Sequence, residues 1–251
     1  MDNNKLFSIW IKNIPHLNIL DCIESWLNLN YIVTLFIDEN LRKYFPIHEN
    51  LELVDIESTN YSPEYLKEFP QIFSDYFRYN YIFQNGGTYI DSDIFLLREL
   101  PSQPSIINTE YTNQSGALKS EALYRPTNNL IRFKSGESFL QDLLEVILKN
   151  KKIIQPNNKN NTILLKPFIK LLKTKYTEYC LFYLQPNLLS PYSFSTIKHL
   201  GKNDGVVSKY GVQVPDIRDI VQNSIGIHLY NNINSEYNLT TIIKKELLND
   251  N

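Results

Sequence analysis

The sequence predicts an α/β fold in which a mainly parallel sheet is flanked by helices. Two observations in the first hundred residues support this prediction. Apolar segments typical of buried strands alternate with segments whose apolar residues recur at helical spacing. The strand segments are continuous apolar runs, as expected for strands that are buried on both faces of a parallel sheet. Ligands bind such sheets at the carboxyl ends of the strands, so we expect the functional residues there.

The elements of this first half follow in order along the chain. The expected strands are Leu6–Ile11, Tyr31–Ile37 and Leu51–Ile56. The expected helices are Leu20–Leu29, a short one at Glu39–Phe45, one that starts at Ser62–Glu64 with a capping Ser and a Pro, and one at about Gln71–Gln84. Asn85 and Gly86 then supply a suitable C-terminal cap for the last helix.

The second half is less regular. The polar segment Ser105–Arg125 is predicted to be a loop or short strands near the site. The remaining expected strands are Leu130–Phe133, Cys180–Leu184 and Ser224–Tyr230, and the expected helices are Ser138–Lys149, Ile163–Thr174 and Thr240–Leu248. Polar or glycine-containing segments predict a turn at Gln155–Asn161 and a flexible loop at Leu200–Gly211.

Composition excludes several classes of protein. With 251 residues and 43% hydrophobic content the chain is long enough for one full core. A net charge of −2 without a Lys/Arg run gives no basis for nucleic-acid binding. Cys22 and Cys180 lie in apolar surroundings and are expected to be reduced core residues. The sequence shows neither a membrane-spanning run nor a secretory signal, so we expect a cytoplasmic protein, with recruitment to a membrane surface left open.

The segment Asp75–Leu100 carries the strongest functional signal. Gly86 and Gly87 precede a predicted strand that delivers Asp91 and Asp93. Two carboxylates two residues apart on an extended segment point to the same side, and together they are unfavourable unless a cation lies between them. The pair alone is a weak signal, but the apolar residues around it indicate a buried strand. The pattern therefore predicts a divalent-metal site for a phosphate-bearing substrate.

Four further residues are candidates. Asp75 and Arg78 share one face of a helix that is apolar nearly all round, so they are expected to be paired or to line a site rather than to form a surface salt bridge. His228, on a late apolar segment followed by Asn231, is as consistent with a core histidine as with a metal ligand. Trp10 at the end of the first strand is a core residue by default, but at the carboxyl edge it would pack against a base.

With these residues in view, the chain resembles DXD-motif sugar transferases, namely initiation mannosyltransferase-like and capsular-polysaccharide enzymes, and more distantly the glucosylating domains of clostridial toxins. The resemblance is carried by four segments: Ser8–Pro15 (SIWIKNIP), Cys22–Trp26 (CIESW), the central block Ser74–Arg78 with Gly86–Asp93, and Ile227–Asn232 (IHLYNN). The chain departs from the family pattern at Leu229 and lacks a Gly-Pro around Asn161–Pro167, both on the acceptor side.

The resemblance implies a GT-A fold, a Rossmann-like sheet that fills residues 1–251 as one domain. Residues 1–100 would bind the nucleotide sugar, and residues 101–251 would form the acceptor side and supply a C-terminal metal ligand. Trp10 would flank the base, and Ser74, Asp75 and Arg78 would bind the sugar hydroxyls and the ribose region. Tyr89 would lie near the diphosphate. The metal ligands would be Asp91, which also contacts the ribose, Asp93, His228 and Asn231.

The expected activity is a metal-dependent, retaining transfer of a sugar from a nucleotide sugar, in the first place a UDP-sugar, to an acceptor. Asp75, Arg78 and Asp93 are the expected catalytic residues. Mn²⁺ or Mg²⁺ suits carboxylates and phosphate oxygens, and a His ligand favours Mn²⁺. A glycan, a lipid-linked saccharide and a protein all remain open as acceptors. Two alternatives remain: a metal-dependent phosphoesterase, and a non-catalytic relative that binds nucleotide sugars or carbohydrate.

Overall fold

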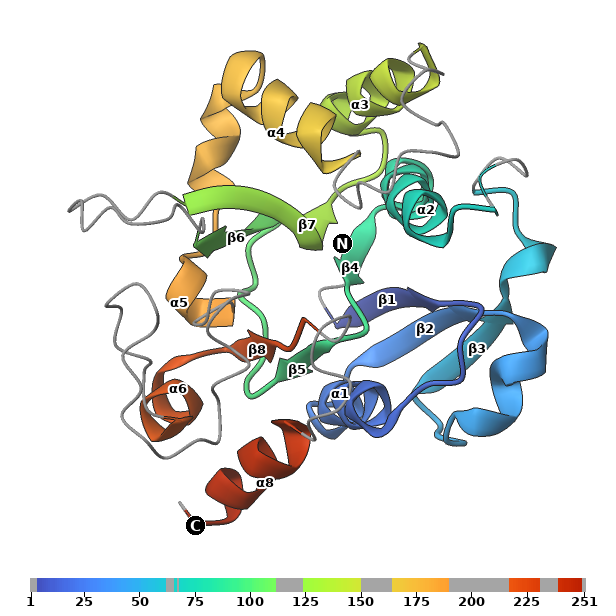
Figure 1. The fold of residues 1–251 in the computed structure, drawn as a ribbon. Coiled ribbons are helices and arrows are strands. Elements are labelled where there is room, and N and C mark those ends of the chain that lie inside the picture. The colour runs from blue at the N-terminus through green and yellow to red at the C-terminus, as the bar shows by residue number, and fades with distance from the viewer. Residues whose placement is uncertain are drawn as a thin grey trace.

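A six-stranded mixed sheet forms the centre of the molecule in the computed structural model, which describes residues 4–61, 66, 68–111, 124–149, 164–189, 217–230 and 239–249. Its strand order is β3-β2-β1-β4-β7-β6 (Figure 1). The strands are β1 (Lys5–Trp10), β2 (Ile32–Ile37), β3 (Leu51–Asp55), β4 (Gly87–Ile90), β6 (Ile106–Tyr111) and β7 (Tyr124–Phe133). β1 to β4 run parallel, whereas β7 and β6 join them in antiparallel pairs. The predicted α/β fold with a mainly parallel sheet is confirmed.

Helices cover both faces of this sheet. The helices are α1 (Leu17–Asn28), α2 (Pro70–Asn85), α3 (Ser138–Lys149), α4 (Leu165–Thr174), α5 (Pro186–Leu189), α6 (Ile217–Asn223) and α8 (Leu239–Asn249), with 3₁₀ turns η1 (Glu39–Tyr44), η2 (Ile56–Ser58) and η5 (Thr177–Phe182). In Figure 1, α2, α3 and α4 lie on one side and α1 and α8 on the other. Each face has its own apolar core. β2 is a continuous apolar run because both of its faces are buried: Val33 and Leu35 pack in one core, and Phe36 packs in the other.

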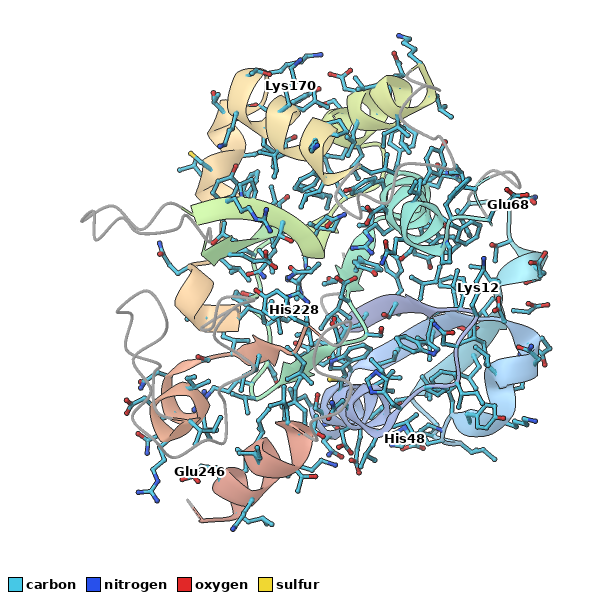
Figure 2. All side chains as sticks on the ribbon, viewed as in Figure 1. Lys12, His48, Glu68, Lys170, His228 and Glu246 are labelled. Atoms are coloured by element: carbon cyan, nitrogen blue, oxygen red, sulfur yellow. The ribbon has the colours of Figure 1, made fainter. Side chains whose placement is uncertain are left out.

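A second, two-stranded sheet brings the C-terminal part of the chain to the site. β5 (Ile94–Leu96) pairs antiparallel with β8 (Gly226–His228), and Ile94 is the partner of His228. The α1 side anchors this sheet, since the Trp26 indole N–H donates to the carbonyl of Ile94 at 2.8 Å. His228 therefore lies in the interior, whereas Lys170 and Glu246 lie at the periphery (Figure 2).

The structure corrects several element predictions. The segment predicted as the strand Cys180–Leu184 is mostly the 3₁₀ turn η5, and Cys180 is exposed rather than in the core, whereas Cys22 is buried as expected. The short helix predicted at Glu39–Phe45 is confirmed as the 3₁₀ helix η1, whereas β7 begins six residues before Leu130. The predicted helix start at Ser62–Glu64, the turn at Gln155–Asn161 and the loop at Leu200–Gly211 lie outside the described residues. No helix within the described ranges has both the length and the apolarity to cross a bilayer.

Candidate functional site

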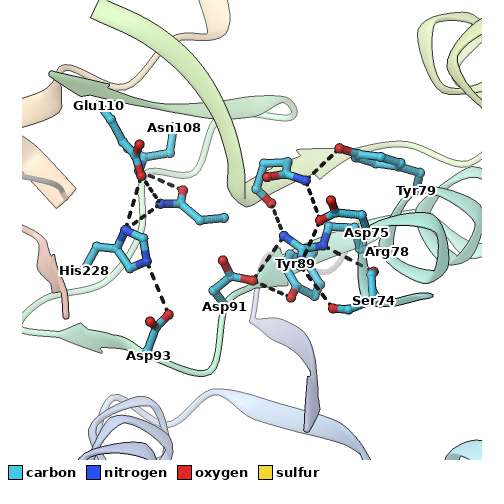
Figure 3. Close-up of polar contacts among 12 residues, drawn as sticks. Ser74, Asp75, Arg78, Tyr79, Tyr89, Asp91, Asp93, Asn108, Glu110 and His228 are labelled. Carbon is cyan, nitrogen blue, oxygen red and sulfur yellow. Dashed lines mark hydrogen bonds and ion pairs between the residues drawn. The ribbon is translucent and has the colours of Figure 1, made fainter. Parts of the chain in front are cut away.

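Asp91 and Asp93 lie on a turn and not, as predicted, on an extended strand. β4 ends at Ile90, and the N–H of Ile94 donates to the carbonyl of Asp91 at 3.1 Å, which closes a tight turn before β5. The N–H of Asp91 donates to the carbonyl of Asn129 at 2.7 Å, so β7 holds the start of the turn. The turn still brings both carboxylates to one place, at the carboxyl end of β4 (Figure 3).

His228 joins these two carboxylates because β8 pairs with β5. The N–H of Leu229 donates to the carbonyl of Asp93 at 2.9 Å, and His228 Nε2 lies 3.3 Å from Asp93 Oδ1. Ligand atoms of Asp91, Asp93 and His228 all lie within 4.8 Å of one another. Burial alone would lower the pKa of His228, but the charges of Asp93 and then Glu110 raise this pKa to about 10.

The donor set of this group fits a divalent cation. Two carboxylates supply hard oxygen ligands, and one imidazole supplies a nitrogen ligand that Mn²⁺ and other transition metals accept. The three side chains are partly open to solvent on the Asp91 side, where the exposed fraction is 25%, and almost closed at His228, where it is 9%. A cation would therefore enter from the side of the two carboxylates. Asn231, the fourth predicted ligand, lies outside the described residues.

Helix α2 brings Ser74, Asp75 and Arg78 to the same edge. The helix begins with Pro70 at its first turn and ends at Gly86, whose positive φ of 70° suits glycine. The apolar residues of α2 are buried against the sheet, which also buries Asp75 and Arg78. The expectation that these two charged residues are paired is confirmed, because Arg78 Nη2 lies 3.3 Å from Asp75 Oδ1.

Arg78 contacts several other residues of the site at once. Its Nη1 lies 3.1 Å from Asp91 Oδ1 and donates to the carbonyl of Asn128 at 2.9 Å. Its Nη2 donates to the Ser74 hydroxyl at 3.1 Å, and its guanidinium carbon lies 4.1 Å from the centre of the Tyr89 ring. The guanidinium is therefore fixed on several sides, and the neighbouring carboxylates keep its pKa above the usual range despite burial.

Burial disfavours the ionised form of two carboxyl groups of the site, Asp75 and Asp91. Burial raises the pKa of Asp75 to about 6, although Arg78 and a hydrogen bond from Asn128 favour the ionised form. Burial also raises the pKa of Asp91, and Arg78 only partly offsets this effect. Carboxyl groups with raised pKa values gain from a nearby cation, so the electrostatics agree with the ligand geometry.

Tyr89 and Trp10 lie near the group of Asp91, Asp93 and His228, Tyr89 in the interior and Trp10 closer to the surface. Tyr89 is buried on β4, and its hydroxyl donates to Asp91 Oδ1 at 2.5 Å, so it lies behind the carboxylate. Trp10 is half-buried at the carboxyl end of β1, where its indole N–H donates to the carbonyl of Asn13 at 2.7 Å. Its ring lies edge-on to His16, with 6.1 Å between the two ring centroids. The charge of Asp93 acts on the pKa of His16 and partly offsets the lowering by burial. Trp10 thus belongs to the same edge of the sheet.

Sequence reasoning missed four residues of the site. Asn128 Nδ2 donates to Asp75 Oδ1 at 2.8 Å and to the Tyr79 hydroxyl at 2.7 Å. Asn129 Nδ2 donates to Glu110 Oε1 at 3.0 Å, and Glu110 Oε1 lies 3.3 Å from His228 Nδ1 (Figure 3). The only signal in the sequence was an adjacent pair of asparagines before a predicted strand, an unusual composition for a buried segment.

Comparison with protein families gives one match. Residues 5–113 match the family described as "Glycosyltransferase sugar-binding region containing DXD motif". The matched region contains the Asp75–Arg78 pair and both carboxylates of the turn, but ends before β7 and β8. No curated protein matches the sequence.

Solved structures give similarities at low sequence identity. The ligand-free glycosyltransferase domain of the YGT toxin has a TM-score of 0.50 and 8% identity, and the match covers 76% of this chain and 81% of that chain. The UDP-bound form of that domain has a TM-score of 0.48, 9% identity and the same coverage of 76% and 81%. The "PaToxG Glycosyltransferase" has a TM-score of 0.48 and 20% identity over 70% of this chain and 69% of that chain. The similarity to the ligand-free YGT toxin domain is a similarity of fold. This chain therefore has the GT-A fold that the family resemblance implied.

Proposed function

We propose that the chain, whose residues 5–113 match the DXD-motif sugar-binding region of glycosyltransferases, is a metal-dependent retaining glycosyltransferase that uses a UDP-sugar. The observation that carries this proposal is the group formed by Asp91, Asp93 and His228, whose ligand atoms lie within 4.8 Å of one another beside Arg78. All 251 residues would act as one catalytic domain, with residues 1–100 on the donor side and 101–251 on the acceptor side.

The metal role rests on the donor set. Asp91, Asp93 and His228 would hold a divalent ion, with Mn²⁺ preferred because of the imidazole and Asn231 as a further candidate ligand. A bound divalent ion stabilises the negative charge that a departing nucleoside diphosphate develops. Asp93 would serve the metal alone, whereas Asp91, which is paired with Arg78, would also lie next to the ribose.

The donor sugar would lie over the α2 side of the group. Asp75 presents a carboxylate oxygen to sugar hydroxyls while Asn128 fixes its position, and Ser74 adds a hydroxyl beside Arg78. Arg78 is held by five polar protein groups, so it would orient the diphosphate or sugar without reorganising during the reaction. Tyr89 sets the position of Asp91 from behind, and Trp10 would stack on the base at the edge of the site.

UDP is the first nucleotide to test because a UDP-bound form of the structurally similar YGT toxin domain is known. The retaining outcome is taken from the family that the sequence resembles. The acceptor would be a glycan, a lipid-linked saccharide or a protein, and we propose a cytoplasmic location for the reaction.

A donor-hydrolysis screen tests the proposal. Purified protein is incubated with a panel of UDP-, GDP- and dTDP-sugars with Mn²⁺, with Mg²⁺ or with EDTA, and free nucleoside diphosphate is measured. We expect Mn²⁺-dependent release from one UDP-sugar, and NMR of the first sugar formed shows whether the anomeric configuration is retained. Hydrolysis of simple phosphodiesters to a phosphomonoester and an alcohol, without any sugar turnover, would favour a phosphoesterase. Binding without turnover would favour a non-catalytic relative.

A further inference from the structure

Glu110 lies directly behind His228 and has no part in the proposed metal or donor binding. It belongs to β6, its side chain is 8% exposed, and its Oε1 lies 3.3 Å from His228 Nδ1. The other ring nitrogen, Nε2, faces Asp93 at 3.3 Å. Asp93 and Glu110 therefore contact opposite nitrogens of the same imidazole (Figure 3).

This arrangement bears on which nitrogen carries the proton. A neutral histidine binds a metal through the nitrogen that has a free lone pair, and the other nitrogen then carries the hydrogen. On His228 the nitrogen on the side of Asp91 and Asp93 is Nε2, so a metal there needs the proton on Nδ1. Such a proton requires an acceptor, and a carboxylate accepts hydrogen bonds without donating any when it is ionised.

Asn129 is the competing partner of Nδ1. Its Nδ2 lies 3.0 Å from His228 Nδ1, and an amide that donated to Nδ1 would put the proton on Nε2, where the metal would bind. The same Nδ2 donates to Glu110 Oε1 at 3.0 Å, and the side-chain oxygen Oδ1 of Asn129 accepts from Asn108 Nδ2 at 2.9 Å. Glu110 thus offers one acceptor to both the amide of Asn129 and the N–H of His228.

The ionised form of Glu110 has its own support. Arg125 Nη2 lies 3.4 Å from Glu110 Oε2, on the carboxylate oxygen that does not face His228. The charge on Glu110 is therefore balanced by one cation on the protein's outer side, since the Arg125 side chain is 42% exposed. This leaves Oε1 available for His228 and Asn129.

We propose that Glu110 is a positioning residue that keeps the proton of His228 on Nδ1 and leaves Nε2 free to bind the divalent cation. The inference rests on the proposed metal site but requires no particular sugar or acceptor. Carboxylate partners of this kind change metal affinity by about 10- to 100-fold when they are removed.

The test measures Mn²⁺ affinity by isothermal titration calorimetry, without nucleotide, in wild type, Glu110→Ala, Glu110→Gln, His228→Ala and the double variant Glu110→Ala/His228→Ala. We expect Glu110→Ala to bind Mn²⁺ about 10- to 100-fold more weakly. Glu110→Gln keeps an oxygen acceptor and should recover part of that affinity. Because Glu110 acts through His228, the double variant should bind no more weakly than His228→Ala.

Glu137→Ala is the matched control, because Glu137 is also a buried glutamate but accepts from the Tyr179 hydroxyl instead of contacting His228. Its Mn²⁺ affinity should equal that of wild type. An unchanged affinity in Glu110→Ala, or additive losses in the double variant, would overturn the inference, since additive losses mean that Glu110 acts on the metal independently of His228.

A second readout covers the case in which Glu110→Ala does not fold. In wild-type protein loaded with diamagnetic Zn²⁺, ¹⁵N NMR should show the His228 proton on Nδ1, and a proton on Nε2 would contradict the inference. The proposed function fails separately: protein that shows this Mn²⁺ pattern but turns over no nucleotide sugar would refute the transferase and support the role of Glu110.

Discussion

Arg78 on α2 lies 3.1 Å from Asp91 on the turn after β4, and this ion pair connects the two halves of the proposed donor site. Asp91 belongs to the metal group, and Arg78 is also paired with Asp75. One guanidinium group thus links the position of the proposed metal ligands to that of the proposed sugar-binding carboxylate.

Arg78→Lys is expected to lower kcat/KM for donor hydrolysis by about 100-fold, because an ammonium group cannot reproduce the planar contacts that hold Asp91 and the carbonyl of Asn128 together. Steady-state kinetics measures the effect. Arg42→Lys is the matched control, since Arg42 pairs with Glu39 at an exposed position, and the variant should leave kcat/KM unchanged. Equal kinetics in the two variants would contradict the role of Arg78.

Asp75 is expected to make the metal-free protein less stable as the pH rises. The folded state raises the pKa of Asp75 from 3.8 to about 6, so it holds this proton more tightly than the unfolded chain does. The associated stability is present below pH 3.8 and is lost as the pH rises through about 6. The loss is on the order of 3 kcal/mol when both forms have ionised.

Asp75→Asn removes this titration. The free energy of unfolding of the variant, relative to that of wild type, should therefore rise as the pH increases from about 4 to about 7. Urea unfolding at a series of pH values in EDTA measures the difference between the two proteins. The same variant should lose donor hydrolysis, since it removes the proposed sugar contact. Parallel pH profiles for the two proteins would show that Asp75 ionises normally.

Trp10→Ala is expected to weaken UDP binding by roughly 5- to 150-fold, the effect of losing one base–aromatic stack, and to leave Mn²⁺ affinity unchanged. Calorimetry measures both affinities. Fluorescence gives a second test, because the chain has two tryptophans and Trp26 is fully buried, so Trp10 is the reporter. Addition of UDP and Mn²⁺ should change the emission of wild type but not that of Trp10→Phe, which keeps a ring for stacking. An unaltered signal change in Trp10→Phe would place the base elsewhere.

Gly226→Ala is expected to destabilise the protein by about 1–3 kcal/mol, the usual cost of overpacking. A Cβ at this position would lie 2.7 Å from the backbone carbonyl oxygen of Phe95, so β8 would have to move away from β5. Because β8 carries His228, the variant should also bind Mn²⁺ more weakly. Urea unfolding and calorimetry measure both effects, and wild-type values in both would show that the β5–β8 pair is not closely packed.

The donor half of the site could be predicted because its signals are local in the sequence. The continuous apolar runs, the buried face of α2 and the short motif at Asp91 and Asp93 each lie within a few neighbouring residues. Even there, the turn after Ile90 was predicted as an extended strand, because Tyr89, Ile90, Ile94 and Phe95 are apolar on both sides of it.

The rest of the site depends on strand pairing between distant segments. Glu110 and Asn129 come together through the antiparallel pair β6–β7, whose register shifts between Ile107 and Thr109. β7 also contains Pro126 and the Asn128–Asn129 pair, residues that are uncommon in strands, so its first six residues gave no strand signal. The pairing of His228 with Ile94 spans more than half of the chain and has no local signal at all.

The central claim is that Asp91, Asp93 and His228 hold a divalent cation that binds the diphosphate of the donor. Calorimetric titration of UDP into the protein, with Mn²⁺ and with EDTA, in wild type and in Asp93→Asn, tests it most directly. We expect wild type to bind UDP at least about 10-fold more tightly with Mn²⁺, and Asp93→Asn to lose that gain while remaining folded. Equal UDP affinity of wild type with Mn²⁺ and with EDTA would contradict the claim.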